Sequence, residues 1–169
     1  SLNESLDYFI ENLHYAKYIG AEMVGLETCR FSDDDEINNS EETYQYLLKN
    51  MKKLVSAAEE IGVNVGIEGV HFHVINTPTK MKRLVDDLNS PNVRVIFDPV
   101  NYINTANYKN QDEIINTHFD LLGEKTKLLH LKDFKLVDGE VTYEFPCDGL
   151  LNKDLLWDKL KQYNPDIAV

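Results

Sequence analysis

The feature that most constrains this sequence is the regular alternation of short apolar runs with longer segments of helical periodicity. Runs rich in branched residues lie at 21–26, 63–68, 93–97, 127–131 and 166–169. Segments with apolar residues three or four positions apart separate them, at 2–19, 40–61, 77–90, 109–122 and 150–163. Short strands that are apolar on both faces and alternate with helices predict a parallel sheet covered by helices. We therefore expect an α/β fold with five strands and five helices.

Local signals refine this pattern at three places. Ser1 and Glu4 fit a capping box at the start of the first helix. The polar, acidic stretch 31–39 reads as a loop, because it lacks any apolar period. The Asp138-Gly139 pair predicts a tight turn in a β-hairpin over 134–143, since both residue types tolerate positive φ angles.

Length and charge narrow the classes of function. A chain of 169 residues with no linker or low-complexity tract is expected to form a single domain over 1–169. Its net charge of -12 argues against binding to nucleic acid or to an anionic membrane. No apolar run is long enough to span a bilayer, and two cysteines, Cys29 and Cys147, fit free, partly buried thiols. We expect a cytoplasmic protein that acts on a small molecule.

Ionisable residues stand at the ends of three of the expected strands. V-G-I-E ends in Glu68, V-I-F-D ends in Asp98, and L-L-H-L-K-D carries His130 and Asp133. The carboxyl ends of parallel strands lie on one side of the sheet, where such folds bind ligands. Two carboxylates and an imidazole suit a divalent cation such as Mn²⁺, Mg²⁺, Co²⁺ or Zn²⁺. From the residues alone, such a site and ordinary loop polarity both remain open.

Three motifs in this region resemble a known family. I-E-G-V-H-F-H-V-I-N-T-P, S-P-N-V-R-V-I-F-D-P-V-N and L-L-H-L-K-D-F, with the spacing between them, resemble the xylose isomerase-like TIM barrels of the sugar phosphate isomerase and epimerase type. The likeness runs from about residue 16 to the end of the sequence. It implies part of a (β/α)8 barrel with about five parallel strands.

The resemblance also implies a metal site. In the family, a glutamate, an aspartate, a histidine and a second glutamate hold a divalent metal, and the first three match Glu68, Asp98 and His130. The second glutamate has no match here. A complete barrel has about 250 residues, so we expect a truncated chain that is itself inactive because this last ligand lies beyond its end.

Neighbouring residues become candidates for substrate contacts. His71 and His73 follow Glu68 in the same loop, and Asn101 stands where many relatives have a histidine. Glu27 ends the strand before Glu68 and is a weaker candidate for the same face. Two further candidates follow His130: Lys132, as a cation beside a developing oxyanion, and Asp133, as a residue that orients Lys132 or a ligand. His14 and His118 fall within helices and read as surface or packing residues.

The resemblance implies a sugar or sugar phosphate isomerase or epimerase of carbohydrate metabolism. Proton transfer would pass through a metal-stabilised enediolate, with Glu68 as one acid or base. An inosose-type dehydratase and a non-catalytic sugar-binding barrel are alternatives. An abasic-site endonuclease shares the fold class, but the net charge and only five histidines argue against it. Unpaired strand edges at 23–26 and 167–169 suggest a homo-oligomer.

Overall fold

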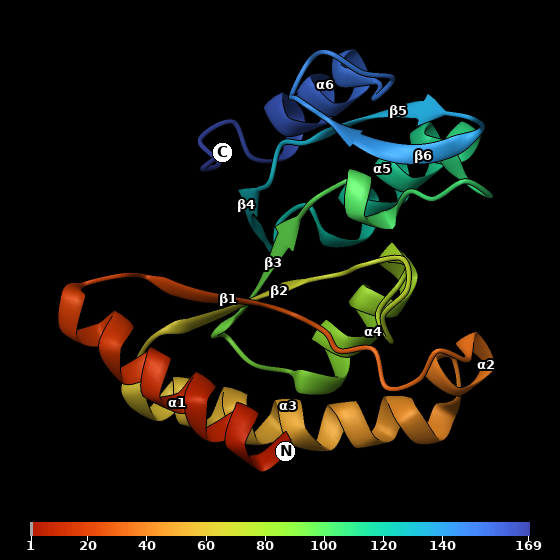
Figure 1. Cartoon of the computed structure of the whole chain (residues 1–169). Coiled ribbons are helices and arrows are strands. Elements are labelled where there is room, and N and C mark those ends of the chain that lie inside the picture. The colour runs from red at the N-terminus through yellow and green to blue at the C-terminus, as the bar shows by residue number, and fades with distance from the viewer. Residues whose placement is uncertain (1) are drawn as a thin grey trace.

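Four parallel strands form the centre of the molecule, described here from a computed structural model that covers residues 2–169, with side chains from residue 4. Ser1, and with it the capping box predicted from Ser1 and Glu4, lies outside the described residues. The strands are β1 (Met23–Glu27), β2 (Asn64–Glu68), β3 (Val93–Phe97) and β4 (Thr126–Leu129), and they pair in the order β1-β2-β3-β4 (Figure 1). This sequential order is that of a barrel, because an open doubly wound sheet reverses its order at a switch point.

Helices connect the strands and pack next to one another around the sheet. The long ones are α1 (Leu2–Ile19), α3 (Glu41–Ile61), α4 (Pro78–Leu88), α5 (Gln111–Leu122) and α6 (Lys153–Tyr163). Each contacts the next along this series, so that α3 lies against α1 and α4, and α5 lies against α4 and α6 (Figure 1). The arrangement confirms the predicted α/β class with helices between parallel strands.

Helix ends follow the residues that favour them. The Ser40 hydroxyl accepts a bond from the Thr43 N–H at the start of α3, and Gly62 closes that helix with a φ of 76°. Thr77 caps α4 in the same way, with Pro78 as the first helical residue. Asn89, with a φ of 45°, ends α4, and β2 and β3 each begin within a few residues of the helix ends at Gly62 and Asn89.

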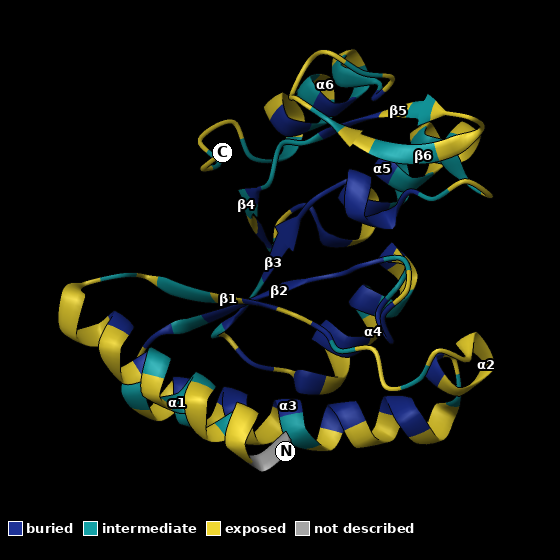
Figure 2. Cartoon of the chain, viewed as in Figure 1, coloured by how far each residue is buried: buried dark blue, intermediate teal, exposed yellow. Residues whose placement is uncertain are grey.

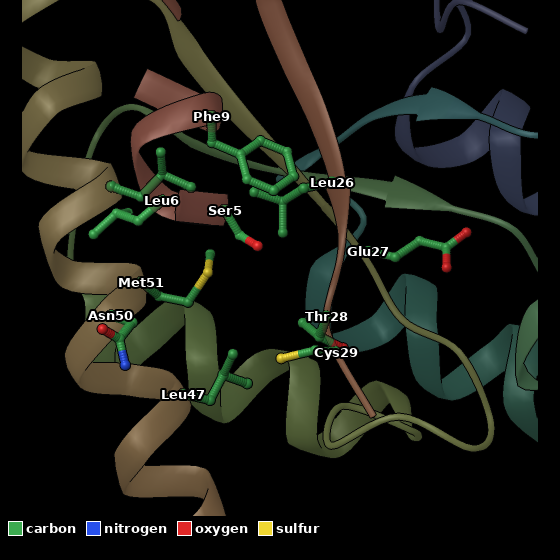
Figure 3. Close-up of a pocket in the computed structure, with 11 residues that line it drawn as sticks. Ser5, Leu6, Phe9, Leu26, Glu27, Thr28, Cys29, Leu47, Asn50 and Met51 are labelled. Atoms are coloured by element: carbon green, nitrogen blue, oxygen red, sulfur yellow. The ribbon is translucent and has the colours of Figure 1, made fainter. Parts of the chain in front are cut away.

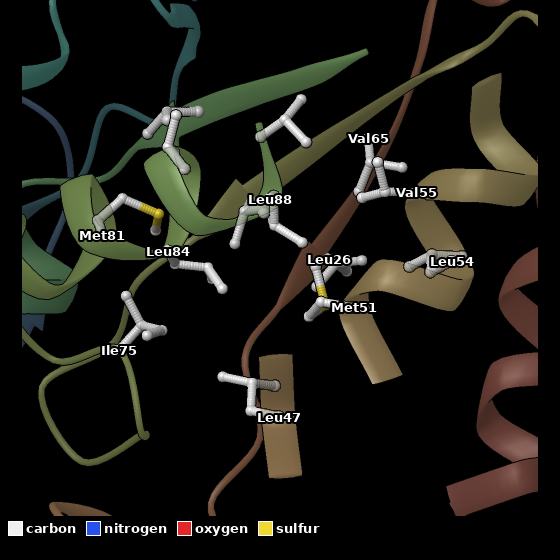
Figure 4. Close-up of a cluster of buried hydrophobic side chains, with 14 of the residues drawn as sticks. Leu26, Leu47, Met51, Leu54, Val55, Val65, Ile75, Met81, Leu84 and Leu88 are labelled. Carbon is white, nitrogen blue, oxygen red and sulfur yellow. The ribbon is translucent and has the colours of Figure 1, made fainter. Parts of the chain in front are cut away.

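Two apolar cores fill the space between sheet and helices. The larger lies between β1, β2 and the helices α1, α3 and α4, where Leu47, Met51 and Leu54 of α3 face Leu26 and Val65 of the strands (Figure 4). The smaller joins β3 and β4 to α5, α6 and the hairpin, around residues such as Phe97, Phe119 and Phe134. Both faces of β2 and β3 are buried (Figure 2), as expected for a sheet with helices outside and side chains within.

Several boundaries differ from the sequence prediction. The strand expected at 166–169 reduces to one bridge between Leu128 and Ala168, because the segment that follows Asn164-Pro165 turns and makes a single ladder bond to Leu129. The loop expected at 31–39 contains a short helix, α2 (Asp35–Asn38), capped by Asp34. Two 3-10 turns were also not predicted, η1 (Val100–Tyr102) and η2 (Tyr108–Asn110).

The predicted hairpin is present as β5 (Asp133–Val137) and β6 (Glu140–Glu144), which turn at Asp138-Gly139 with positive φ at both residues. The last helix begins at Lys153 rather than near residue 150. The segment before this helix is instead tied to the hairpin, because the Leu150 N–H donates a hydrogen bond to the Phe134 carbonyl.

The two cysteines are free thiols, but Cys147 is exposed rather than partly buried, because it lies in the turn after β6. Among residues 2–169, no helix combines the length and the apolar character needed to cross a membrane.

His118 is a polar side chain enclosed by the smaller core. It is fully buried in α5 and stacks on Phe97, with ring centroids 3.6 Å apart. The Thr126 hydroxyl donates its hydrogen to the Leu122 carbonyl, so its oxygen is left to accept from His118 Nε2 at 2.9 Å. His118 Nδ1 then has no partner, and burial lowers the pKa of the imidazole to about 3. His118 is therefore a packing residue, neutral in the folded protein.

This buried histidine predicts a specific loss of stability in acid. The unfolded chain binds a proton at His118 near pH 6.5 and the folded chain only near pH 3, so stability falls as pH falls through that window. Between pH 6.5 and 4.5 the wild type should lose about 2 kcal/mol more unfolding free energy than His118→Gln. Urea denaturation across this range measures it, with exposed His14→Gln as the control. Equal pH slopes for His118→Gln and the wild type would contradict the assignment.

Candidate metal centre

The strand register brings the three predicted residues onto one face of the sheet. Glu68 pairs with Ile96 of β3, and Asp98 lies two residues beyond Ile96, so both side chains point to the same side. Ile96 pairs with Leu128 of β4, and His130 lies two residues beyond Leu128. The His130 N–H still donates to the Phe97 carbonyl, which carries the ladder one residue past the end of β4. His130, predicted within the strand, thus stands just after it.

One potential ligand atom from each of Glu68, Asp98 and His130 lies within 4.8 Å of the others. Glu68 and Asp98 are buried, whereas the His130 side chain is 41% exposed. The His130 Nδ1 atom lies 3.1 Å from Glu68 Oε2. Among the described residues, this is the group of carboxylates, thiols and imidazoles that is arranged to hold a metal ion.

Asp98 offers one oxygen to the centre. Its Oδ1 accepts the backbone N–H groups of Val100 and Asn101, at 3.0 Å and 3.2 Å, in the turn η1. Its Oδ2 is fully buried and receives no hydrogen bond of good geometry, although Lys132 Nζ lies 2.7 Å away as an ion pair. The carboxylate is therefore fixed by the backbone through Oδ1, while Oδ2 faces the Lys132 ammonium.

Asn101 links the two halves of the centre. Its side-chain nitrogen donates to Glu68 Oε1 at 2.6 Å, and its side-chain oxygen accepts from Lys132 Nζ at 3.2 Å. Asn101 is buried, so both of its polar atoms are engaged inside the protein. The amide was predicted from sequence as a substrate contact, and the structure places it between a carboxylate and an ammonium.

Charges and burial shift the proton affinities of these groups. Burial raises the pKa of Glu68, and the nearby Asp98 carboxylate adds to this effect, while His130 and Lys132 oppose it. Burial alone would lower the pKa of Lys132, but the Asp98 and Glu68 carboxylates outweigh it and raise that pKa. The site thus holds a carboxylate that accepts protons readily beside a lysine that stays charged.

Tyr102 adjoins the centre and was not identified from the sequence. Its hydroxyl is fully buried without a hydrogen-bond partner, and burial together with Glu68 and Asp98 raises its pKa. The ring lies against Gly69, where an added Cβ would meet the hydroxyl at 2.2 Å. The glycine directly after Glu68 is the only sequence signal of this contact, since it marks a close approach.

Asp133 lies after Lys132 but faces another segment. Its carboxylate accepts the backbone N–H groups of Phe134, Gly149 and Leu151 at 2.8 to 2.9 Å, and Lys153 Nζ lies 3.2 Å away. Burial alone would raise its pKa, but these donors together lower it. Asp133 thus ties the chain after His130 and Lys132 to the segment before α6. No bond joins it to Lys132 among the contacts described.

The remaining candidates lie at the end of β1 and in the loop after β2. Glu27 pairs in register with Glu68, so the two side chains share a face, and Figure 3 shows Glu27 turned away from the apolar side chains next to it. The His71 N–H donates to the Asn101 carbonyl at 2.7 Å, which holds the loop after β2 against η1. His73 is buried with an unpartnered Nδ1, and burial lowers the pKa values of both histidines.

A separate pocket of ≈ 200 Å³ lies on the opposite face of β1. Apolar residues of α1 and α3 line it, including Phe9 and Met51, and Leu26 and Thr28 point into it (Figure 3). It contains neither Asp98 nor His130, so the charged centre and the most apolar pocket are different places.

The match to a family model decides what kind of fold holds this centre. Residues 2–169 match the model described as xylose isomerase-like TIM barrel. The chain belongs to the xylose isomerase-like TIM barrel family. Its four parallel strands and their helices are part of such a barrel. No curated protein matches the chain.

Solved structures agree with this family at the level of the fold. A D-tagatose 3-epimerase-like protein gives a TM-score of 0.77 at 19% identity, covering 99% of this chain and 63% of its own. The xylose isomerase domain protein of Planctomyces limnophilus gives 0.74 at 17%, covering 96% and 56%. The IolI protein with a bound zinc atom gives 0.73 at 20%, covering 96% and 57%. The chain thus spans less than two thirds of the length of these TIM barrels.

The anchor at Asp133 gives a prediction about stability. In Asp133→Asn, a side-chain NH₂ group replaces one of two oxygens that accept bonds, so it faces donors and leaves a buried N–H unpaired. Unfolding free energy should fall by about 2 to 3 kcal/mol in urea denaturation. Asp138→Asn, in the exposed hairpin turn, is the matched control and should remain near wild type. A loss equal to that of the control would argue against the anchor.

Proposed function

We propose that this chain carries the metal-binding half of a divalent-metal-dependent sugar or sugar phosphate isomerase or epimerase. The observation that carries the proposal is the convergence of Glu68, Asp98 and His130 at the ends of three parallel strands. Membership of the xylose isomerase-like family supports it, as do structural neighbours described as epimerase-like and as zinc-bound.

The residues present suit a divalent cation. Asp98 Oδ2 is a buried anionic oxygen that no hydrogen bond satisfies, and Glu68 Oε2 and His130 lie close by. Two carboxylate oxygens and an imidazole form a donor set for Mn²⁺, Mg²⁺, Co²⁺ or Zn²⁺. A cation bound there supplies Lewis-acid polarisation of a substrate carbonyl and an adjacent hydroxyl.

The chain's own groups account for the proton transfer. Glu68 takes the proton from the carbon next to the carbonyl, and its raised pKa suits a base that must also return a proton. The Lys132 ammonium faces the oxygen that gains negative charge in the resulting enediolate and stabilises it. Asn101 holds Glu68 from one side, so that Oε2 remains on the side of His130. His71, His73 and Glu27 border this space and would contact sugar hydroxyls.

Calorimetric titration with Mn²⁺ tests the metal site. The wild-type chain should bind the ion, and both Glu68→Gln and His130→Ala should weaken binding by at least about tenfold, since each removes a ligand. Glu27→Gln is the matched control, because it removes the same charge from the neighbouring register position. Binding that survives both ligand substitutions unchanged would rule out this site.

Exchange of a sugar proton with solvent tests the chemistry. A Mn²⁺-loaded protein that holds this chain within a complete barrel, given D-fructose in D₂O, should exchange a C–H proton next to the carbonyl with solvent, and NMR follows the exchange. Glu68→Gln should abolish this exchange because the proposed base is lost, whereas Glu60→Gln, at an exposed position of α3, should retain it. Loss of water from the sugar instead of exchange would indicate a dehydratase, and metal binding with neither reaction would indicate a sugar-binding barrel.

A further inference from the structure

The two carboxylate oxygens of Asp98 have different partners. Oδ1 is occupied by the N–H groups of Val100 and Asn101, and the turn η1 cannot release them without unfolding locally. A cation at this site must therefore use Oδ2. Lys132 Nζ already lies 2.7 Å from that same buried oxygen, and the next positive charge would stand directly beside the ammonium.

Lys132 has room to move away from Asp98. Its side chain is 42% exposed, whereas the Asp98 side chain is wholly buried, so the lysine can leave and the carboxylate cannot. A second acceptor, Asn101 Oδ1, lies 3.2 Å from the ammonium. The ring of Tyr143 on β6 offers a third contact, with Lys132 Nζ 5.5 Å from its centroid.

Asn101 contacts the other carboxylate of the centre, that of Glu68. Glu68 has two equivalent oxygens, and the Asn101 N–H holds Oε1 at 2.6 Å. This leaves Oε2, 3.1 Å from His130 Nδ1, as the oxygen that faces the centre. A carboxylate held by such a partner is oriented before an ion arrives, and removal of partners of this kind commonly weakens metal binding.

We propose that Asn101 and Lys132 set the metal affinity of this site in opposite directions: Asn101 is a positioning residue that turns Glu68 Oε2 toward the ion, and Lys132 is a resident cation that competes with it for Asp98 Oδ2. The inference rests on the proposed metal site and adds an order of events to it. Binding of the ion displaces the Lys132 ammonium from Asp98, and only then is the lysine free to face a substrate oxygen.

Calorimetric titration of Mn²⁺ into two variants tests the opposite signs. Lys132→Met should bind Mn²⁺ about tenfold or more tightly than the wild type, because the competing charge is gone. Asn101→Leu should bind about tenfold or more weakly, because Glu68 is no longer oriented. Lys135→Met, on the exposed side of β5, removes the same charge nearby and should change the affinity less than about twofold. General structural damage would weaken binding in both test variants.

The visible absorption of the Co²⁺-loaded chain adds a readout of the ligand arrangement. Asn101→Leu should alter the spectrum, whereas Lys135→Met should reproduce that of the wild type. An unchanged spectrum with unchanged affinity would overturn the role of Asn101. Unchanged or weaker Mn²⁺ binding by Lys132→Met would overturn the competition, even where the wild type binds and the metal site itself stands.

If the chain has no metal site, the Mn²⁺ titrations of the wild type and the variants give a different pattern. If neither the wild type nor Lys132→Met binds Mn²⁺, the proposed function and this inference both fall. If only Lys132→Met binds, the competition is supported in its strongest form. Lys132→Gln is the second variant in case Lys132→Met does not fold, since its amide still donates to Asp98 without a charge. Circular dichroism of each variant establishes that it is folded.

Discussion

The burial of two carboxylates side by side is the constraint on which the rest of this site depends. Glu68 and Asp98 stand on adjacent strands, both buried, and like charges at such distances repel strongly in a medium less polar than water. Four kinds of group stabilise these two carboxylates: backbone N–H groups of η1, the Asn101 amide, the His130 ring and the Lys132 ammonium. Each of these comes from a segment that directly follows β3 or β4.

The scaffold makes this compensation possible by fixing where those segments leave the sheet. Sequential parallel pairing puts three strand ends at one edge, and the even spacing from Ile96 to Asp98 and from Leu128 to His130 keeps their side chains on one face. Beyond His130 the described backbone is no longer hydrogen-bonded to β3. There the bonds of Asp133 to residues 149–153 hold the backbone that carries His130 and Lys132.

The sequence predicted the parts of this site that depend on periodicity. The strand ends near Glu68, Asp98 and His130 could be recognised because apolar runs stop there and the carboxyl ends of parallel strands lie on one side of the sheet, and the family resemblance then pointed to these three residues. The strand expected at 166–169 is only a single bridge, since a three-residue apolar run says nothing about the turn before it. The partner of Asn101 could not be predicted either. Whether an amide at a strand end faces a substrate or a carboxylate depends on the register of a different strand.

Asp133 illustrates a further limit of reasoning from the sequence. In L-K-D-F the aspartate is next to Lys132 in the chain, and proximity suggests that the two interact. The backbone there is extended at the start of β5, so successive side chains point to opposite faces. Lys132 therefore forms an ion pair with Asp98, whereas Asp133 accepts hydrogen bonds from the segment before α6. The two adjacent charged residues thus contact different parts of the fold.

The same geometry bears on the proposed binding of a cation. Among the chain's own groups at this site, the carboxylates of Glu68 and Asp98 face one ammonium, that of Lys132. The carboxylates therefore outnumber the ammonium in a largely buried place, where Asp98 Oδ2 lies next to Lys132 and Glu68 Oε2 lies next to His130. Under the proposed function, a divalent cation bound here would reverse the sign of this group, and a proton taken by Glu68 from a neutral sugar would move negative charge toward Lys132. Under that proposal, the arrangement would favour negative charge that develops on the substrate, which is where an isomerase requires it.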